Sequence, residues 1–131
     1  MPASVTLPLI RHELQVLSEL VPLEGQRIIE LGCGNARLAR QLLQVYPTSY
    51  VTGLEVDARQ HAKNLADPRE HLSFVAAGAQ DVPFPDAYFD LALMLKSLHH
   101  VPLHLMDQAL GEVARALPPG GHLYVSEPVY D

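Results

Sequence analysis

The sequence predicts an α/β fold, a three-layer sandwich in which a parallel β-sheet has helices on both faces. Segments with apolar residues at helical spacing alternate along the chain with short apolar runs, as in successive strand–helix units. The run 89–95 is almost entirely apolar, which is typical of a strand covered on both faces. With 131 residues and 48% hydrophobic content, residues 1–131 are expected to form a single domain with one core.

The elements follow from local patterns. An amphipathic helix is expected over residues 8–20, and a strand over 28–31 runs into the turn Gly32-Cys33-Gly34. Asn35 is expected to cap the next helix, 36–45, because its side chain can accept hydrogen bonds from N–H groups that a helix start leaves unpaired. The remaining expected elements are a strand at 50–56, a helix at 58–65, a strand at 72–76, a proline-rich loop at 83–86, a strand at 89–95, a helix at 103–117, a break at 118–121 and a strand from 122 to 125 or beyond.

Charge and cysteine content exclude several classes of function. The 15 acidic and 9 basic residues give a net charge of −6, which would repel a phosphate backbone, so nucleic-acid binding is not expected. The single cysteine allows no internal disulfide and no multi-cysteine metal site, so we expect a cytoplasmic protein without a metal. The sequence has neither a signal-peptide pattern nor an apolar run long enough to cross a membrane.

The turn after the first strand is the most informative feature. Gly32 can adopt a turn conformation that a side chain would forbid, and Gly34 lets the backbone approach a ligand closely. A strand, a Gly-x-Gly turn and a helix in this order hold nucleotide-type cofactors at the carboxyl end of a parallel strand. An NAD fingerprint has a third glycine where this chain has Arg37, so an NAD(P)-dependent oxidoreductase is a weaker alternative. Glu30, just before the turn, points to a ligand with a positive group.

Several stretches together resemble the class I S-adenosylmethionine-dependent methyltransferases, particularly the small-molecule group that includes the ubiquinone/menaquinone-type C-methyltransferases. They are residues 29–36, 53–57, 74–90, and 98–101 with 117–121, within a region of about 25–127. The resemblance implies a Rossmann-like fold with strand order 3-2-1-4-5, here without the family's usual C-terminal β-hairpin. It also implies S-adenosylmethionine as cofactor, S-adenosylhomocysteine as product and a small-molecule methyl acceptor.

The resemblance implies roles for individual residues. Glu55 would accept hydrogen bonds from the ribose hydroxyls, and Glu30 would organise the amino group of the methionine part. The alternatives are a surface acid for Glu55 and an ion pair with Arg27 or Arg37 for Glu30. Gly78 stands where many relatives carry Asp or Asn, so it cannot make their contact with the adenine amino group. The other expected cofactor-binding positions are Gly32, Cys33, Gly34, Val56, Ala79, Gln80 and Leu95.

No catalytic residue can be assigned from the sequence, because methyl transfer from a sulfonium chiefly requires alignment and exclusion of water. His99 and His100 are candidates for a general base, with packing against the following helix as the alternative. Lys96 is either a contact for an anionic substrate or a solvated loop charge. A catalytically silent S-adenosylmethionine-binding module, or a fragment completed by a partner chain, is the second interpretation of the chain.

The last predicted strand has consequences for assembly. Family sheets normally continue past strand five, whereas this sequence stops at Asp131, so we expect a C-terminally truncated or minimal version with strand five at an edge. Leu123, Tyr124 and Val125 would then offer unpaired backbone groups. The sequence therefore predicts self-association, as a homodimer, or poor solubility through this edge.

Overall fold

The structure, a computed structural model, describes residues 13–127, so the start of the predicted helix 8–20 and residues 128–131 lie outside the description. Five parallel strands form one sheet of order β3-β2-β1-β4-β5, as predicted. The elements are α2 (Glu13–Leu20), β1 (Arg27–Leu31), α3 (Arg37–Val45), β2 (Tyr50–Leu54), α4 (Ala58–Leu65), β3 (Leu72–Val75), β4 (Leu91–Leu95), two 3-10 turns (Leu98–His100 and Leu103–Leu105), α5 (Met106–Ala116) and β5 (His122–Ser126).

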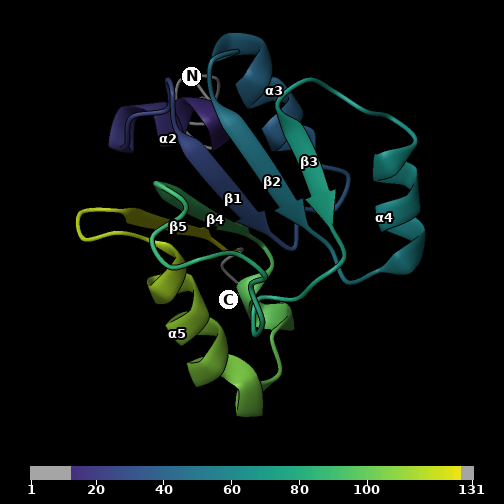
Figure 1. The fold of residues 1–131 in the computed structure, drawn as a ribbon, viewed down its shortest axis with the longest axis vertical. Helices are drawn as coiled ribbons and strands as arrows, with labels where there is room; N and C mark the ends of the chain where they lie inside the picture. The colour runs from purple at the N-terminus through teal and green to yellow at the C-terminus, as the bar shows by residue number, and fades with distance from the viewer. Residues whose placement is uncertain (1–12, 128–131) are drawn as a thin grey trace, which may run out of the picture.

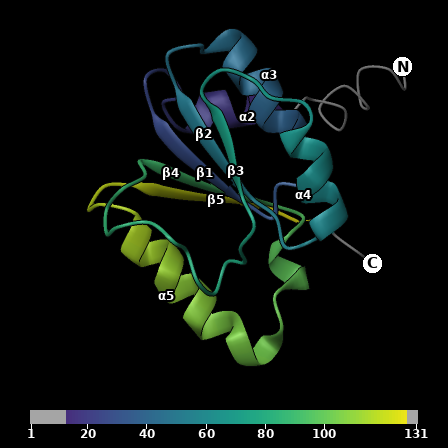
Figure 2. The same ribbon diagram turned by 45° about the vertical axis from the view of Figure 1, so that its right-hand side comes forward.

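The fold has three layers, and β1 is the central strand of the sheet that forms the middle layer. Helices α2 and α3 cover one face of the sheet and α5 covers the other, while α4 lies beside β3 (Figures 1 and 2). Side chains alternate between the two faces, so Ile28 packs in the α2–α3 core with Leu42, and Ile29 packs in the α5 core with Val113. No helix within residues 13–127 is long and apolar enough to cross a membrane.

Three predicted strands, 50–56, 72–76 and 89–95, are longer than the observed ones, and long-range hydrogen bonds set the ends of the first and the last. Strand β2 stops at Leu54, whose carbonyl accepts the N–H groups of both Gly32 and Cys33 at 2.9 Å and so closes the glycine turn. Strand β4 begins after Phe89, whose N–H donates to the Ala116 carbonyl at the end of α5. Helix α4, by contrast, has the predicted bounds.

The start of α3 differs from the prediction. The N-cap residue is Ala36, in a left-handed conformation with φ of 60°, rather than Asn35. Asn35 still stabilises the helix start, because its Oδ1 accepts the Arg37 N–H at 3.0 Å. The turn therefore takes one residue more than the sequence pattern indicated.

Strand β5 is the edge of the sheet on the α5 side and pairs with β4 alone among the described strands. Its Leu123 and Val125 side chains are 38% and 39% exposed, so this edge lacks the cover that buries β4. Helix α2 is tied to the other face of the same strand, since Glu13 accepts hydrogen bonds from the hydroxyls of Tyr124 and Ser126. Burial and the neighbouring Glu13 raise the pKa of Tyr124 to about 12, so this phenol stays a donor.

Candidate cofactor and acceptor site

The two glycines of the turn have different tasks. Gly32 has φ of +72°, and a Cβ added to it would lie 2.7 Å from Cβ of Ser97, so no side chain fits there. Ser97 comes this close because its hydroxyl donates to the Leu31 carbonyl at 2.8 Å. Gly34 has φ of +55°, and a Cβ there would meet no described atom within 4 Å. Gly32 therefore joins two loops, whereas Gly34 leaves space that a ligand can fill.

Glu55 braces this turn from the end of β2. Its Oε1 accepts the Gly34 N–H at 2.9 Å, and its Oε2 accepts the Asp57 N–H at 3.0 Å. Asp57 in turn caps α4 by accepting the N–H groups of Arg59 and Gln60. Glu55 is thus a half-buried, oriented carboxylate rather than a free surface acid, and each oxygen keeps lone pairs for a further donor.

Two adjoining cavities meet at the turn and share Gly32, Gly34 and Lys96. The larger, of about 670 Å³, is lined by Leu31, Gly32, Gly34, Glu55, Val56, Ala77, Gly78, Ala79, Gln80, Met94, Lys96, Ser97, His100, Val101 and Pro102. The smaller, of about 460 Å³, is lined by Glu13, Glu30, Gly32, Cys33, Gly34, Asn35, Arg37, Leu38, Gln41, Leu95 and Lys96. The structure therefore gathers all the expected cofactor-binding positions around one continuous region at the carboxyl ends of the strands.

Glu30 is a buried carboxylate without an ordinary partner. It is 4% exposed, and its Oε1 accepts no hydrogen bond from the described residues. Burial and repulsion from Glu55 raise its pKa to about 8. The alternative ion pair is wrong, because the Arg27 guanidinium lies 4.8 Å from the Tyr88 ring centre and Arg37 forms no ion pair with Glu30 among residues 13–127. An unsatisfied buried carboxylate facing a cavity suits a cationic ligand group.

Gln80 fills the space that the unusual Gly78 leaves. A Cβ added to Gly78 would lie 2.6 Å from Oε1 of Gln80, so the Gln80 amide occupies the place of a side chain at 78. The Gln80 carbonyl accepts Nε2 of Gln108 at 2.9 Å, which ties this loop to α5. Val56 lines the same cavity with a side chain that is 72% exposed. An amide and an apolar side chain thus border the cavity that Glu55 also lines.

Cys33 packs the turn against its neighbours. Its side chain is buried, a Cβ at Gly53 would lie 2.7 Å from its Sγ, and the Asn64 amide lies 3.8 Å from that sulfur. Burial, with the nearby Glu30, raises the Cys33 pKa to about 12, so the thiol is not a nucleophile at neutral pH. Asn64 also donates to the Gly34 carbonyl at 2.8 Å. The sequence analysis did not predict this role of Asn64. The one feature that could have indicated it is a polar residue on the buried side of a short helix.

Two candidate bases lie in the 3-10 turn after β4. The side chain of His99 lies outside the description, whereas His100 is exposed and lines the larger cavity. The loop opposite is held by Arg115 of α5, which donates to the carbonyls of Val82 and Phe84 at 2.8 Å each. Sequence reasoning missed Arg115, because its partners lie about thirty residues earlier in the chain.

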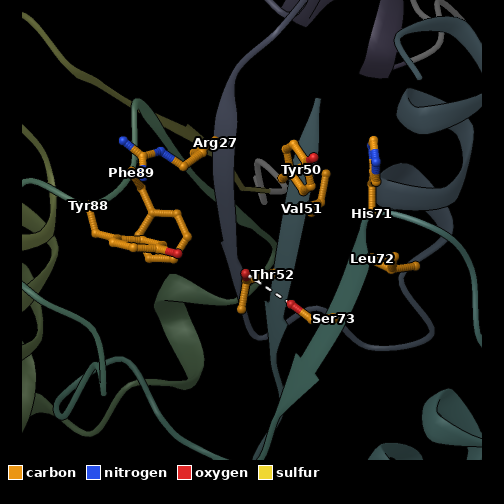
Figure 3. Close-up of a pocket in the computed structure, with 9 residues that line it drawn as sticks. All are labelled: Arg27, Tyr50, Val51, Thr52, His71, Leu72, Ser73, Tyr88 and Phe89. Atoms are coloured by element: carbon orange, nitrogen blue, oxygen red, sulfur yellow. Dashed lines mark hydrogen bonds between the residues drawn. The ribbon is translucent and has the colours of Figure 1, made fainter. Parts of the chain in front are cut away.

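A further cavity, of about 410 Å³, lies at the opposite end of the sheet, where β1 and β2 begin (Figure 3). Tyr50 stacks on His71 with ring centres 4.0 Å apart, and Thr52 is hydrogen-bonded to Ser73 at 3.2 Å. None of the expected cofactor-binding residues lines this cavity, so it is separate from the region around the glycine turn.

Comparisons with known proteins agree with this geometry. A family model described as a methyltransferase domain matches residues 29–125. A fatty-acid O-methyltransferase of Mycolicibacterium smegmatis is 35% identical over 142 residues, which cover 99% of this chain and 49% of that protein. The 27-O-demethylrifamycin SV methyltransferase of Amycolatopsis mediterranei is 34% identical over 119 residues, covering 85% of this chain and 42% of that protein.

Among solved structures, the cyclase SpnF is 30% identical and superposes with a TM-score of 0.77, covering 87% of this chain and 43% of that one. The chain spans about half the length of the curated relatives that it matches.

Proposed function

We propose, from the premise that the chain belongs to the methyltransferase domain family of class I S-adenosylmethionine-dependent enzymes, that it transfers a methyl group to an oxygen of a small molecule. The cofactor of this family is S-adenosylmethionine. The observation that carries the proposal is the Glu30 carboxylate, buried without a partner for Oε1 beside a glycine turn that Glu55 braces. S-adenosylmethionine presents an ammonium and two ribose hydroxyls, the groups that two such carboxylates can bind.

The residues around the turn fit the parts of this cofactor. Glu30 would accept from the amino group in the smaller cavity, and Glu55 would accept from the ribose hydroxyls in the larger cavity. The Gln80 amide and the Val56 side chain would border the adenine. The open side of Gly34 would let the backbone contact the ligand closely.

When bound, S-adenosylmethionine supplies a methyl group on a positively charged sulfur. The protein then has to align the acceptor and exclude water. Ser97 and Gly32 keep the loop after β4 against the turn, so the acceptor side of the larger cavity has a fixed wall. For a hydroxyl acceptor, His100 lies at this cavity and can accept the proton.

Oxygen as the acceptor atom is supported by the relatives, whose names describe methylation of a fatty acid and of a rifamycin oxygen. Carbon methylation of the ubiquinone/menaquinone type is the second acceptor chemistry that we propose to test. Incubation with S-adenosylmethionine carrying a deuterated methyl group, and with separate pools of acids, phenols and quinols, followed by mass spectrometry, distinguishes the two. A labelled ester or ether supports oxygen transfer, and a label only on ring carbon contradicts it.

A second candidate function is binding of S-adenosylmethionine without methyl transfer. The similarity to a solved structure whose name describes a cyclase favours it, because this fold then serves reactions other than methylation. The two functions differ in one product. Formation of S-adenosylhomocysteine in step with substrate loss supports methyl transfer, whereas binding of S-adenosylmethionine with no S-adenosylhomocysteine formed from any substrate pool supports the second function.

We also propose that the exposed edge of β5 pairs with a second copy of the chain. The proposal rests on β5 pairing with β4 alone among the described strands and on its exposed Leu123 and Val125. Light scattering at increasing concentration should show a dimer, and a monomer at millimolar concentration would contradict it.

A further inference from the structure

Lys96 has a backbone conformation that lysine rarely adopts. It follows β4 with φ of +57°, in the left-handed region that favours glycine. The surrounding structure imposes this conformation, because the Lys96 N–H donates to the Ser126 carbonyl of β5 at 2.6 Å. Glycine would occupy this position without strain, so a lysine here has a cost in stability.

The surroundings of Lys96 indicate what its side chain can bind. It is the one Lys or Arg among the described residues that line the larger cavity, and it is exposed. It forms no ion pair with a carboxylate of residues 13–127. The residues that line the same cavity include the apolar side chains of Leu31, Met94, Val101 and Pro102. A free ammonium beside apolar walls suits an anionic group on an apolar body.

We propose that the methyl acceptor is the carboxylate of an apolar organic acid, and that Lys96 binds this carboxylate and determines the specificity for it. The proposal rests on the proposed function and names its substrate class. A carboxylate oxygen forms the bond to the methyl carbon while the carbon–sulfur bond breaks, and the bonding electron pair stays on sulfur. A carboxylate and a sulfonium thus give a neutral methyl ester and a neutral thioether. No proton moves, so the step requires neither His99 nor His100.

One other anion competes for Lys96. The residue lines both cavities, so the methionine carboxylate of the cofactor is the alternative ligand for its ammonium. The two possibilities differ in which ligand loses affinity when the charge is removed. Lys96→Met removes the charge and keeps much of the side-chain length, whereas Lys96→Arg keeps the charge.

Calorimetric titration measures both affinities without turnover. Wild-type chain is titrated with S-adenosylhomocysteine and, once saturated, with decanoate or with decanol, which has the same chain length without the charge. We expect decanoate to bind at least tenfold more tightly than decanol. Lys96→Met should weaken decanoate at least tenfold and change the S-adenosylhomocysteine affinity less than twofold, and Lys96→Arg should retain the preference for decanoate.

Three results would overturn the inference: no decanoate binding by the saturated wild type, equal decanoate affinity in Lys96→Met, or a parallel loss of S-adenosylhomocysteine affinity in that variant. Absence of S-adenosylhomocysteine binding by folded wild type is a different result, which rejects the proposed function and the inference with it.

A stability measurement separates function from folding. Lys96→Gly relieves the backbone strain, so its urea midpoint should be at least that of wild type while decanoate binding is lost. Ala87→Gly is the matched control, because Ala87 has φ of +55° and lines neither cavity at the glycine turn. It should keep full decanoate binding. Decanoate affinity equal to wild type in Lys96→Gly would overturn the inference.

Discussion

Replacing Gly34 with alanine should weaken cofactor binding well beyond its effect on folding, and Gly25→Ala provides the control. The two glycines have φ of +55° and +67°, and a Cβ at either position would meet no described atom within 4 Å. Left-handed strain costs an alanine about 1–2 kcal/mol. Loss of chain entropy in the unfolded state returns about 0.4–1 kcal/mol of that. Both variants should therefore lose about 1 kcal/mol in free energy of unfolding.

The two positions differ in whether the added methyl group faces a cavity. Gly34 lines both cavities at the turn, whereas Gly25 lies before β1 and lines neither. A methyl group at position 34 takes space that a ligand in close contact with the backbone would fill. We expect the affinity for S-adenosylhomocysteine to fall at least tenfold in Gly34→Ala, which corresponds to about 1.4 kcal/mol, and to stay unchanged in Gly25→Ala.

Urea unfolding followed by circular dichroism measures the free energy of unfolding of each variant. Calorimetric titration of each folded variant measures its affinity for S-adenosylhomocysteine. Equal cofactor affinity in Gly34→Ala and wild type would refute the assignment of this turn as a ligand contact. An equal loss of affinity in Gly25→Ala would show that the loss comes from folding rather than from contact.

Three further predictions test other parts of the site. Glu55→Ala should weaken S-adenosylhomocysteine binding by about tenfold to a hundredfold, the value of one hydrogen bond to a charged group, and unchanged calorimetric affinity would contradict the ribose role. Glu30→Gln should gain stability relative to wild type as pH rises from about 4.5 to about 8. The pKa of Glu30 is about 8 in the folded protein and 4.5 in the unfolded chain, so wild type is most stable below pH 4.5, where Glu30 is protonated in both states, and loses stability as pH rises toward 8. Parallel curves of urea unfolding against pH for the two proteins would contradict it. Arg115→Gln should speed amide hydrogen exchange at Val82, Phe84 and Asp86, because the Val82 and Phe84 carbonyls lose their donor, and unchanged protection at these amides would contradict it.

Local sequence patterns were sufficient to predict much of the fold. Helix α4 begins and ends at the predicted residues, 58 and 65, and the strand order agrees with the resemblance. The ends of β2 and β4 were not predictable, because they depend on bonds to Leu54 and Phe89 from residues distant in sequence. Propensity and periodicity describe neighbours along the chain and contain no information about such pairings.

The site was predictable at the level of residue type but not of contact. The sequence pointed to Glu30 and Glu55, while their difference became visible only in three dimensions, where one braces the turn and the other is buried with Oε1 unpaired. The role of Asn64 depends on a helix packing against a turn some thirty residues away. The Gln80 amide occupies the space that a side chain at position 78 would fill. This depends on the side-chain rotamer of Gln80, which a sequence pattern does not specify.

Calorimetric titration of the 131-residue chain with S-adenosylmethionine, S-adenosylhomocysteine and NADH tests the central claim most directly. The predicted result is micromolar binding of the first two, about −7 to −8 kcal/mol, with no detectable binding of NADH. A folded sample that binds neither sulfur-containing ligand, or that binds NADH more tightly, would contradict the assignment of the glycine turn and its two carboxylates to S-adenosylmethionine.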